Sequence, residues 1–115
     1  MISRLFRFRG HHSLTTVYQR GQTVRGSFLQ LKYTTRRDQR YRAAVVVSRK
    51  VHKSAVVRNR IRRRIYEILR QQQAKLQGKD VVVTVFSEQV ANMEHQKLVN
   101  ALTQLIEKTG HNPQA

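Results

Sequence analysis

Residues 42–48 read RAAVVVS and residues 81–86 read VVVTVF, and between these stretches lies a segment long enough for one long helix. Both stretches are rich in β-branched residues and continuously apolar in the middle, which predicts interior strands that are buried on both faces. A strand, helix, strand order with so long a connection favours a βαβ unit whose two strands are parallel. The sequence therefore indicates an α/β fold.

The segment between these strands, residues 54–73, has the period of an amphipathic helix. At about 100° per residue, its large aliphatic residues fall on one stripe of a helical wheel, which is expected to pack in the core. The glutamines at 71–73 are interpreted as the exposed end of this helix. The apolar stripe consists of Val57, Ile61, Ile65, Ile68 and Leu69.

The exposed side of the same helix is basic, because five of the seven residues from Arg58 to Arg64 are arginines. Arginines four residues apart, such as Arg60 and Arg64, repel each other by roughly 0.2 to 0.5 kcal/mol per pair, and only Glu67 offsets this repulsion. Phosphate groups would neutralise it, and the planar guanidinium binds phosphate with two parallel hydrogen bonds. We therefore predict a phosphate-binding surface. On the wheel, Asn59, Arg60, Arg62, Arg63 and Tyr66 face outward or to the flanks, and Arg58 and Arg64 border the apolar stripe.

The charge of the chain is concentrated in its first two thirds. Lysine and arginine number 23 against 6 acidic residues, a formal net charge of +17. Residues 1–75 hold 20 basic and 2 acidic side chains, whereas residues 76–115 hold 3 and 4. This excess is larger than solubility requires and indicates a polyanionic partner, nucleic acid rather than an anionic membrane. Since no helix-turn-helix or zinc-finger pattern is present, recognition of folded RNA by its shape fits best.

Before the strand at 42–48, the sequence predicts a short helix and another strand. Residues 13–21 predict the helix, with Ser13 as a candidate N-cap and Gly21 as its terminator. Residues 27–33 alternate with period two, as in a half-buried strand. Residues 34–41 are expected to form a polar, mobile hairpin loop.

A final helix is predicted over about residues 93–109, starting near Asn92 and stopping at Gly110. The last residues, 110–115, are expected to be a frayed tail. A chain of this length fits one domain, residues 1–115, with one core.

The sequence contains binding chemistry without cleavage chemistry. Its six acidic residues are scattered and its histidines lack partners, so we expect no metal ligands, no bound cofactor and no catalytic group in the protein. The absence of cysteine fits a reducing compartment such as the cytoplasm. No stretch approaches the roughly 20 apolar residues of a membrane span, and the N-terminus has no signal-peptide pattern.

Residues 47–51 read VSRKV, a strand end followed by two basic residues, and residues 55–63 read AVVRNRIRR, a helix with an Arg-Asn-Arg motif. These two stretches resemble the signature of the bacterial ribonuclease P protein family. The resemblance extends more loosely over nearly the whole chain. It implies an α/β (α+β) two-layer sandwich with a four-stranded, mostly antiparallel sheet and three helices. It also implies a left-handed βαβ crossover, against the general right-handed rule.

The resemblance implies a function as well: the protein subunit of a ribonucleoprotein endoribonuclease in which the RNA carries the catalysis. Such a subunit would assist the Mg²⁺-dependent removal of the 5′ leader from precursor tRNA, with the Mg²⁺ held by the RNA. It would be a monomer in a 1:1 complex with the catalytic RNA. The alternative is a structural ribosomal protein with a similar composition and fold, from which only the ordered motif separates this chain.

In the family, the motif region docks on the catalytic RNA. The resemblance carries this role over to residues that lie in or beside the motif. They are Arg58, Asn59, Arg60, Arg62 and Arg63, with Arg49 and Lys50 as flanking contacts.

A cleft between the sheet and the first helix holds the precursor tRNA leader in the family. Leu14 and Tyr18 occupy the matching places on the helix, and either Phe28 or Tyr33 supplies a third ring from the following strand. Plain core packing is the open alternative for these side chains. One departure from the family pattern, the longer segment at 51–54, leaves the geometry of the loop before the motif helix undetermined.

Overall fold

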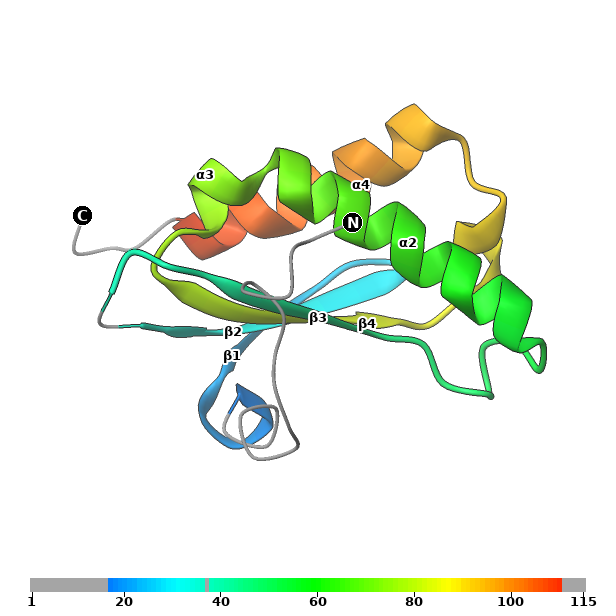
Figure 1. Ribbon diagram of the computed structural model, residues 1–115, viewed down its shortest axis with the longest axis horizontal. Helices are drawn as coiled ribbons and strands as arrows, with labels where there is room; N and C mark the ends of the chain where they lie inside the picture. Colours follow the sequence, from blue (N-terminus) through cyan, green and yellow to red (C-terminus); the bar gives the residue numbers. More distant parts are fainter. Residues whose placement is uncertain (1–16, 37, 111–115) are drawn as a thin grey trace.

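The computed structural model describes residues 17–36 and 38–110, which form one four-stranded sheet packed against helices (Figure 1). After a helical turn at residues 17–20, the elements are β1 (Gln22–Arg25), β2 (Leu29–Thr35), β3 (Arg42–Val46), α2 (Ala55–Gln71), α3 (Gln73–Leu76), β4 (Lys79–Val85), the 3-10 helix η2 (Glu88–Ala91) and α4 (His95–Gly110). The expected α+β class with a four-stranded sheet is confirmed, and α3 and η2 are short helical elements that the sequence did not indicate.

The order of the strands in the sheet is β1-β2-β4-β3. β2 is antiparallel to both β1 and β4, and β3 is parallel to β4, so the predicted parallel pair is confirmed. The prediction of an interior position holds for β4 but is wrong for β3, which is an edge strand. β3 is apolar nonetheless, because Ala43 and Val45 face the main core and Ala44 packs on the other side of the sheet.

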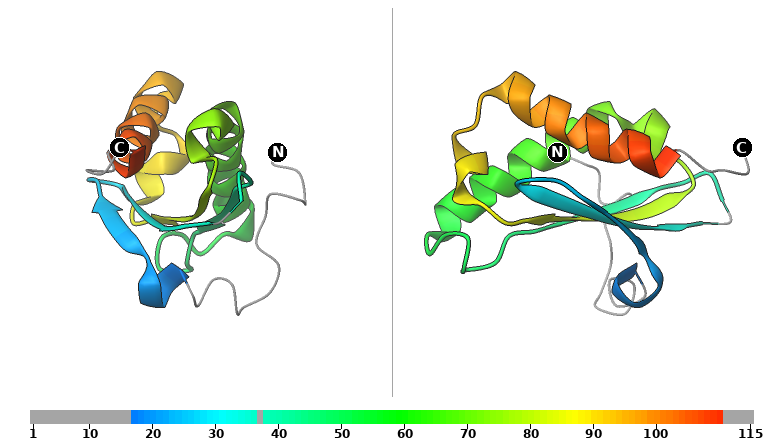
Figure 2. Two further views of the ribbon diagram at one scale, coloured as in Figure 1. Left: turned by 90° about the vertical axis from the view of Figure 1, so that its left-hand side faces the viewer. Right: turned by 180° about the vertical axis from the view of Figure 1, so that it is seen from behind.

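The crossover from β3 through α2 to β4 is left-handed. In the left view of Figure 2, β3 runs away from the viewer, α2 lies above it, and β4 lies further towards the left. The chain therefore turns anticlockwise as it recedes. The family resemblance predicted this hand, whereas the general rule for parallel strands would have predicted the opposite one.

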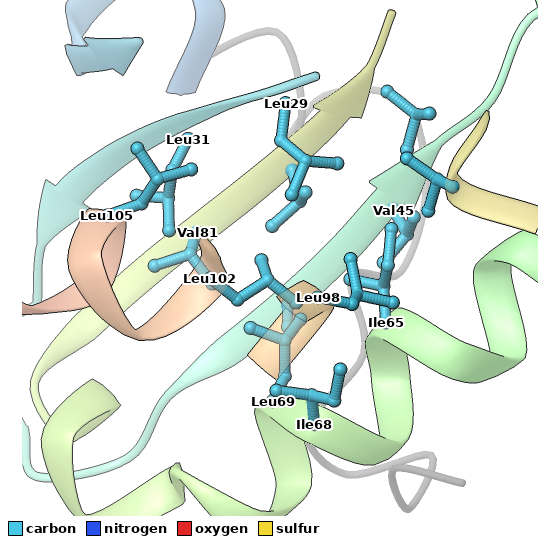
Figure 3. Close-up of a cluster of buried hydrophobic side chains, with 14 of the residues drawn as sticks. Leu29, Leu31, Val45, Ile65, Ile68, Leu69, Val81, Leu98, Leu102 and Leu105 are labelled. Carbon is cyan, nitrogen blue, oxygen red and sulfur yellow. The ribbon is translucent and has the colours of Figure 1, made fainter. Parts of the chain in front are cut away.

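The main core fills the space between the sheet and the helices α2 and α4 (Figure 3). The register pairs Leu29 with Val85 and Leu31 with Val83, so alternate residues of β2 and β4 point into it. Each aliphatic side chain buried here contributes about 1.5 to 3 kcal/mol. The predicted stripe of α2 is confirmed, with Val57 half-buried at its start. The fully buried helical side chains include Ile61, Ile65, Ile68, Leu69, Leu98 and Leu102.

The helical turn at residues 17–20 lies on the opposite face of the sheet from α2 and α4 (Figures 1 and 2). Its buried residue Val17 packs against Ala44 and Val82 in a second, smaller cluster. Gly21 ends the turn as predicted, because its N–H donates to the Val17 carbonyl oxygen at 2.7 Å. A Cβ at Gly21 would lie 2.3 Å from that oxygen, so only glycine allows this close approach.

The segment between β2 and β3 does not form the predicted hairpin, because β4 lies between these two strands. Tyr41, placed in the loop by its polar neighbours, is buried in the main core. Beside it, Asp80 at the start of β4 accepts hydrogen bonds from Arg36 at 2.9 Å and from Arg42 at 2.7 Å. A buried carboxylate needs such partners, and they tie the ends of β2, β3 and β4 together.

Two further elements differ from the expectations. The residues of β1 are mostly exposed and polar, so no apolar alternation marked this strand in the sequence. The glutamines at 71–73 do not simply continue the helix end: Gln72 separates α2 from α3, and its Nε2 donates to Thr103 Oγ1 of α4 at 2.8 Å. This side-chain bond joins the two helices.

The predicted N-cap Ser13, the predicted cleft residue Leu14 and the tail at 111–115 lie outside the described residues. Within residues 17–36 and 38–110, no helix is both long and apolar enough to cross a membrane.

Candidate nucleic-acid interface

The arginines of α2 divide into two groups with different surroundings. Asn59, Arg60 and Arg63 are exposed. Arg62 is half-buried and donates a short hydrogen bond to Asn59 Oδ1, while Arg60 Nη1 reaches Asn92 Oδ1 at 3.5 Å. In this group, the guanidinium groups remain at the outer surface of the helix, available to phosphate oxygens.

The second group is bound to backbone carbonyl groups of the protein itself. Arg64 donates to the carbonyl oxygens of Val90 at 2.7 Å, Ala91 at 3.1 Å and Met93 at 2.5 Å, at the end of η2. Arg58 Nη1 donates to the carbonyl oxygens of His52 and Lys53, both at 2.9 Å. These carbonyl oxygens partly neutralise the charge of Arg58 and Arg64, so these two guanidinium groups are held by the protein itself.

The loop before α2 has a defined geometry. The Val51 N–H donates to the Ser48 carbonyl oxygen at 3.0 Å, and the Ser54 N–H donates to His52 Nδ1 at 3.0 Å. Ser54 Oγ then accepts from the Val57 N–H at 3.3 Å as the N-cap of α2. The predicted flanking residues Arg49 and Lys50 are exposed in the turn that this loop makes. The loop therefore brings them to the end of α2 that carries the arginines.

Tyr66 differs from the outward orientation that the helical wheel predicted. Its ring is half-buried and packs against the main core, and its hydroxyl oxygen accepts from the Val45 N–H of the edge strand β3 at 3.2 Å. The hydroxyl still has its own proton to donate. Contact between Tyr66 and RNA stays a prediction, but the residue has a structural role in the protein.

Among the described residues of the predicted leader cleft, Tyr18 has a solvent-exposed side chain. Its side chain is 41% exposed, and the turn at residues 17–20 to which it belongs lies on the face of the sheet opposite α2 and α4 (Figure 2). Lys32 Nζ lies 5.5 Å from the centroid of its ring and donates to the Tyr18 carbonyl oxygen at 3.2 Å. An exposed ring beside an ammonium group suits a nucleotide, whose base can stack while its phosphate meets the cation.

Phe28 and Tyr33 lie on the other face of the sheet from Tyr18. Phe28 packs against the main core, with Lys97 Nζ of α4 5.5 Å from its ring centroid. Tyr33 is paired with Val81 in the register and also packs against that core, and its hydroxyl donates to Gln22 Oε1 at 2.8 Å. The structure does not bring these rings together with Tyr18, and their contact with a leader stays a prediction.

Phe86 is an exposed ring that the sequence interpretation assigned to a buried strand. β4 ends at Val85, which points into the main core, so the next side chain points to the opposite face. Phe86 is 41% exposed, and Arg25 Cζ lies 5.0 Å from its ring centroid. Alternation from Val83 and Val85 could have predicted the face on which Phe86 lies, but not its exposure, because Val82 on that same face is buried.

Three acidic residues among those that the structure describes, Asp38, Glu67 and Asp80, form ion pairs with arginines. Arg36 hydrogen-bonds Asp38 as well as Asp80, and these bonds lower the pKa of Asp38 to about 2. Arg70 hydrogen-bonds Glu67 and lowers the pKa of Glu67 to about 2. Among residues 17–36 and 38–110, no group of three or more acidic, histidine or cysteine side chains could hold a metal ion.

An arginine-rich helix on one side of a small sheet, with exposed rings paired with cations on the other side, defines an RNA-binding protein of the α+β class. A family model described as Ribonuclease P matches residues 2–110. The chain therefore belongs to the ribonuclease P protein family, the protein subunits of the ribonucleoprotein endoribonuclease that processes the 5′ end of tRNA.

Individual relatives agree with this assignment. The chain is 39% identical over 87 residues to the ribonuclease P protein component of Pseudanabaena sp., covering 74% of this chain and 75% of that one. It is 34% identical over 110 residues to that of Caldanaerobacter subterraneus subsp. tengcongensis, covering 95% and 93%. The solved ribonuclease P protein from Thermotoga maritima shares its fold, with a TM-score of 0.79 at 20% identity over 89% of this chain and 96% of that chain.

Proposed function

We propose that the protein docks on the catalytic RNA of ribonuclease P through the outer surface of α2 and the turn before it. This proposal rests on the difference between two groups of arginines in α2. Backbone carbonyl groups of the protein bind Arg58 and Arg64, whereas Arg60, Arg62 and Arg63 remain at the surface. Surface guanidinium groups without a buried partner bind phosphate oxygens strongly. Arg49 and Lys50 extend the same surface.

The second RNA, in this proposal, is the single-stranded 5′ leader of precursor tRNA, bound on the other face of the sheet beside Tyr18. α2 and the turn at residues 17–20 lie on opposite faces of the sheet. A chain with one RNA surface on each side can hold a catalytic RNA and a substrate at the same time. One protein per RNA is sufficient for this arrangement, so we expect a 1:1 complex in the cytoplasm, where precursor tRNA is processed.

In this proposal the catalytic RNA, and not the protein, binds the Mg²⁺. The arginine surface would neutralise phosphate charge and so lower the Mg²⁺ concentration that the RNA needs for folding and cleavage. This division of labour also separates the proposal from a structural ribosomal role, which the family assignment does not favour.

Reconstitution with a bacterial ribonuclease P RNA tests the proposal. At limiting Mg²⁺, added protein should accelerate the release of the 5′ leader from precursor tRNA, and this effect should fade as Mg²⁺ is raised. Cleavage by the protein without any RNA subunit, or no acceleration at any Mg²⁺ concentration, would overturn the proposal.

Substrate binding gives an independent measurement on the same complex. Tyr18→Ala should weaken the binding of precursor tRNA while leaving mature tRNA, which has no leader, unaffected. An equal loss for both substrates would place the role of Tyr18 in protein packing instead.

A further inference from the structure

Three large apolar side chains of the described residues are markedly exposed: Tyr18, Val56 and Phe86. The two aromatic ones share a local arrangement. Each has a cation over its ring, Lys32 Nζ at 5.5 Å for Tyr18 and Arg25 Cζ at 5.0 Å for Phe86. An exposed ring that a cation covers is a platform for a nucleobase, and the same cation can bind the adjoining phosphate.

Both ring and cation pairs lie on the face of the sheet opposite α2 and α4. Val24, Leu31 and Val85 point into the main core, so the neighbouring side chains Arg25, Lys32 and Phe86 point to the other face. The contact between Arg25 and Phe86 agrees with this alternation. The turn at residues 17–20, which carries Tyr18, lies on that same face.

The backbone positions of the two pairs are separated by a short distance along β2. Phe86 lies level with residue 28, since its N–H donates to the Phe28 carbonyl oxygen at 2.8 Å. Tyr18 is reached by Lys32, four residues further along this segment. At about 3.3 Å per residue, this separation is roughly 13 Å, which a few nucleotides of extended single-stranded RNA can span.

The surface between the two pairs is polar. Gln30 and Thr84 are paired in the register and point to the same face, between the levels of Lys32 and Phe86. Their amide and hydroxyl groups can hydrogen-bond to ribose hydroxyls or base edges. No acidic side chain lies at these paired positions, so the route from Tyr18 to Phe86 does not repel a polyanion.

We propose that Phe86 and Arg25 form a second base-stacking site that binds a nucleobase of the precursor tRNA leader, a few nucleotides away from the one at Tyr18. This inference rests on the proposed function. The base stacks on the Phe86 ring, and the guanidinium of Arg25 binds the phosphate beside it. Because every base has an aromatic face, the site tolerates different leader sequences.

Binding of precursor tRNAs with nested leaders to the reconstituted holoenzyme tests this site. With a long leader, Phe86→Ala should weaken binding by about fivefold to a hundredfold, the usual effect of losing one stacked base. Leaders shortened stepwise should lose this difference abruptly at one length, because a leader that does not reach Phe86 cannot sense the substitution. Mature tRNA should bind the variant and the parent alike.

Matched variants separate stacking from packing. Phe86→Tyr keeps the ring and should bind like the parent, whereas Phe86→Leu keeps apolar volume without a ring and should bind like Phe86→Ala. Val56→Ala removes an exposed apolar side chain on α2, outside this face, and should leave the preference for precursor over mature tRNA unchanged.

The outcomes also distinguish this site from the proposed function. If Tyr18→Ala loses the preference for precursor while Phe86→Ala keeps it at every leader length, the second site is overturned and the proposed function stands. A loss in Phe86→Ala that is equal for precursor and mature tRNA overturns the second site too. If neither variant changes binding and the protein does not accelerate cleavage, both fail.

Discussion

Arg60 and Arg64 are one turn apart in α2 and have the same chemistry, but the structure gives them different tasks. Arg60 is exposed, whereas Arg64 donates three hydrogen bonds to the carbonyl groups at the end of η2. Arginine suits both tasks because its planar group has five N–H donors and is always charged. The difference comes from the position of each residue relative to the apolar stripe of the helix.

Substituting these two arginines separately should therefore give opposite results. Arg60→Ala should weaken binding to the catalytic RNA and lower the slope of log affinity against log salt by about 0.7 to 0.9, with unchanged stability. Arg64→Ala should leave that slope unchanged and lower the free energy of unfolding by about 1 to 3 kcal/mol, because carbonyl groups lose their partner. Salt-dependent RNA binding and urea unfolding measure the two effects. A similar change of slope in both variants would contradict this division.

Tyr66 is expected to act mainly through the edge strand. Its hydroxyl accepts from the Val45 N–H, which is otherwise on the open side of β3. Tyr66→Phe keeps the ring in place and should lower the free energy of unfolding by about 0.5 to 1.5 kcal/mol in urea titrations. If the stability of this variant is unchanged while RNA affinity drops, the hydroxyl acts on RNA and not on β3.

At the scale of the element, the loop before α2 and the helix start form one hydrogen-bonded unit. His52 accepts from the Ser54 N–H, Ser54 caps the helix, and Arg58 reaches back to the loop carbonyl groups. The unit holds the turn with Arg49 and Lys50 beside the exposed arginines. The start of α2 therefore sets the shape of the proposed docking surface as well as the boundary of the helix.

Removing the cap should weaken this unit. Ser54→Ala leaves the Val57 N–H without its partner and should lower the free energy of unfolding by about 0.5 to 2 kcal/mol. Ser54→Asp keeps a capping oxygen and should retain the stability of the parent, which makes it the matched control. Urea unfolding of the three proteins measures the effect, and equal losses in both variants would show that capping is not what Ser54 contributes.

For the whole molecule, the sheet separates the two proposed RNA surfaces, and the main core holds α2 on one side of it. Beyond the end of β2, Arg36 joins Asp38 to the buried Asp80, which also binds Arg42. These ion pairs connect three strands and the segment after β2.

The lowered pKa values of Asp38 and Glu67, each about 2, predict how stability depends on pH. A carboxylate whose pKa is lower in the folded than in the unfolded chain stabilises the fold above its ordinary pKa and loses this effect as the pH falls through the folded value. The free energy of unfolding should therefore fall between about pH 5 and pH 2. Asp38→Asn should show a smaller fall over this range and meet the parent near pH 2. A parallel decline in both proteins would contradict the role of Asp38.

Much of the fold and part of the site follow from local patterns in the sequence. The valine-rich stretches, the length between them and the period of residues 54–73 determine a parallel βαβ unit with its apolar stripe inward. The run of arginines determines that the outer surface of this helix is cationic. These properties need only side-chain periodicity and charge, which neighbours along the chain specify.

The tertiary structure alone decided which arginines are available to bind phosphate and which aromatic rings lie on the same face of the sheet. The carbonyl groups that bind Arg64 lie 26 to 29 residues further along the chain, so no local pattern marks them. Phe28 and Tyr33 face the main core while Phe86 faces the other side, because pairing register and the bend between β1 and β2 set these directions. The hand of the crossover and the edge position of β3 likewise depend on packing between distant segments, which periodicity does not encode.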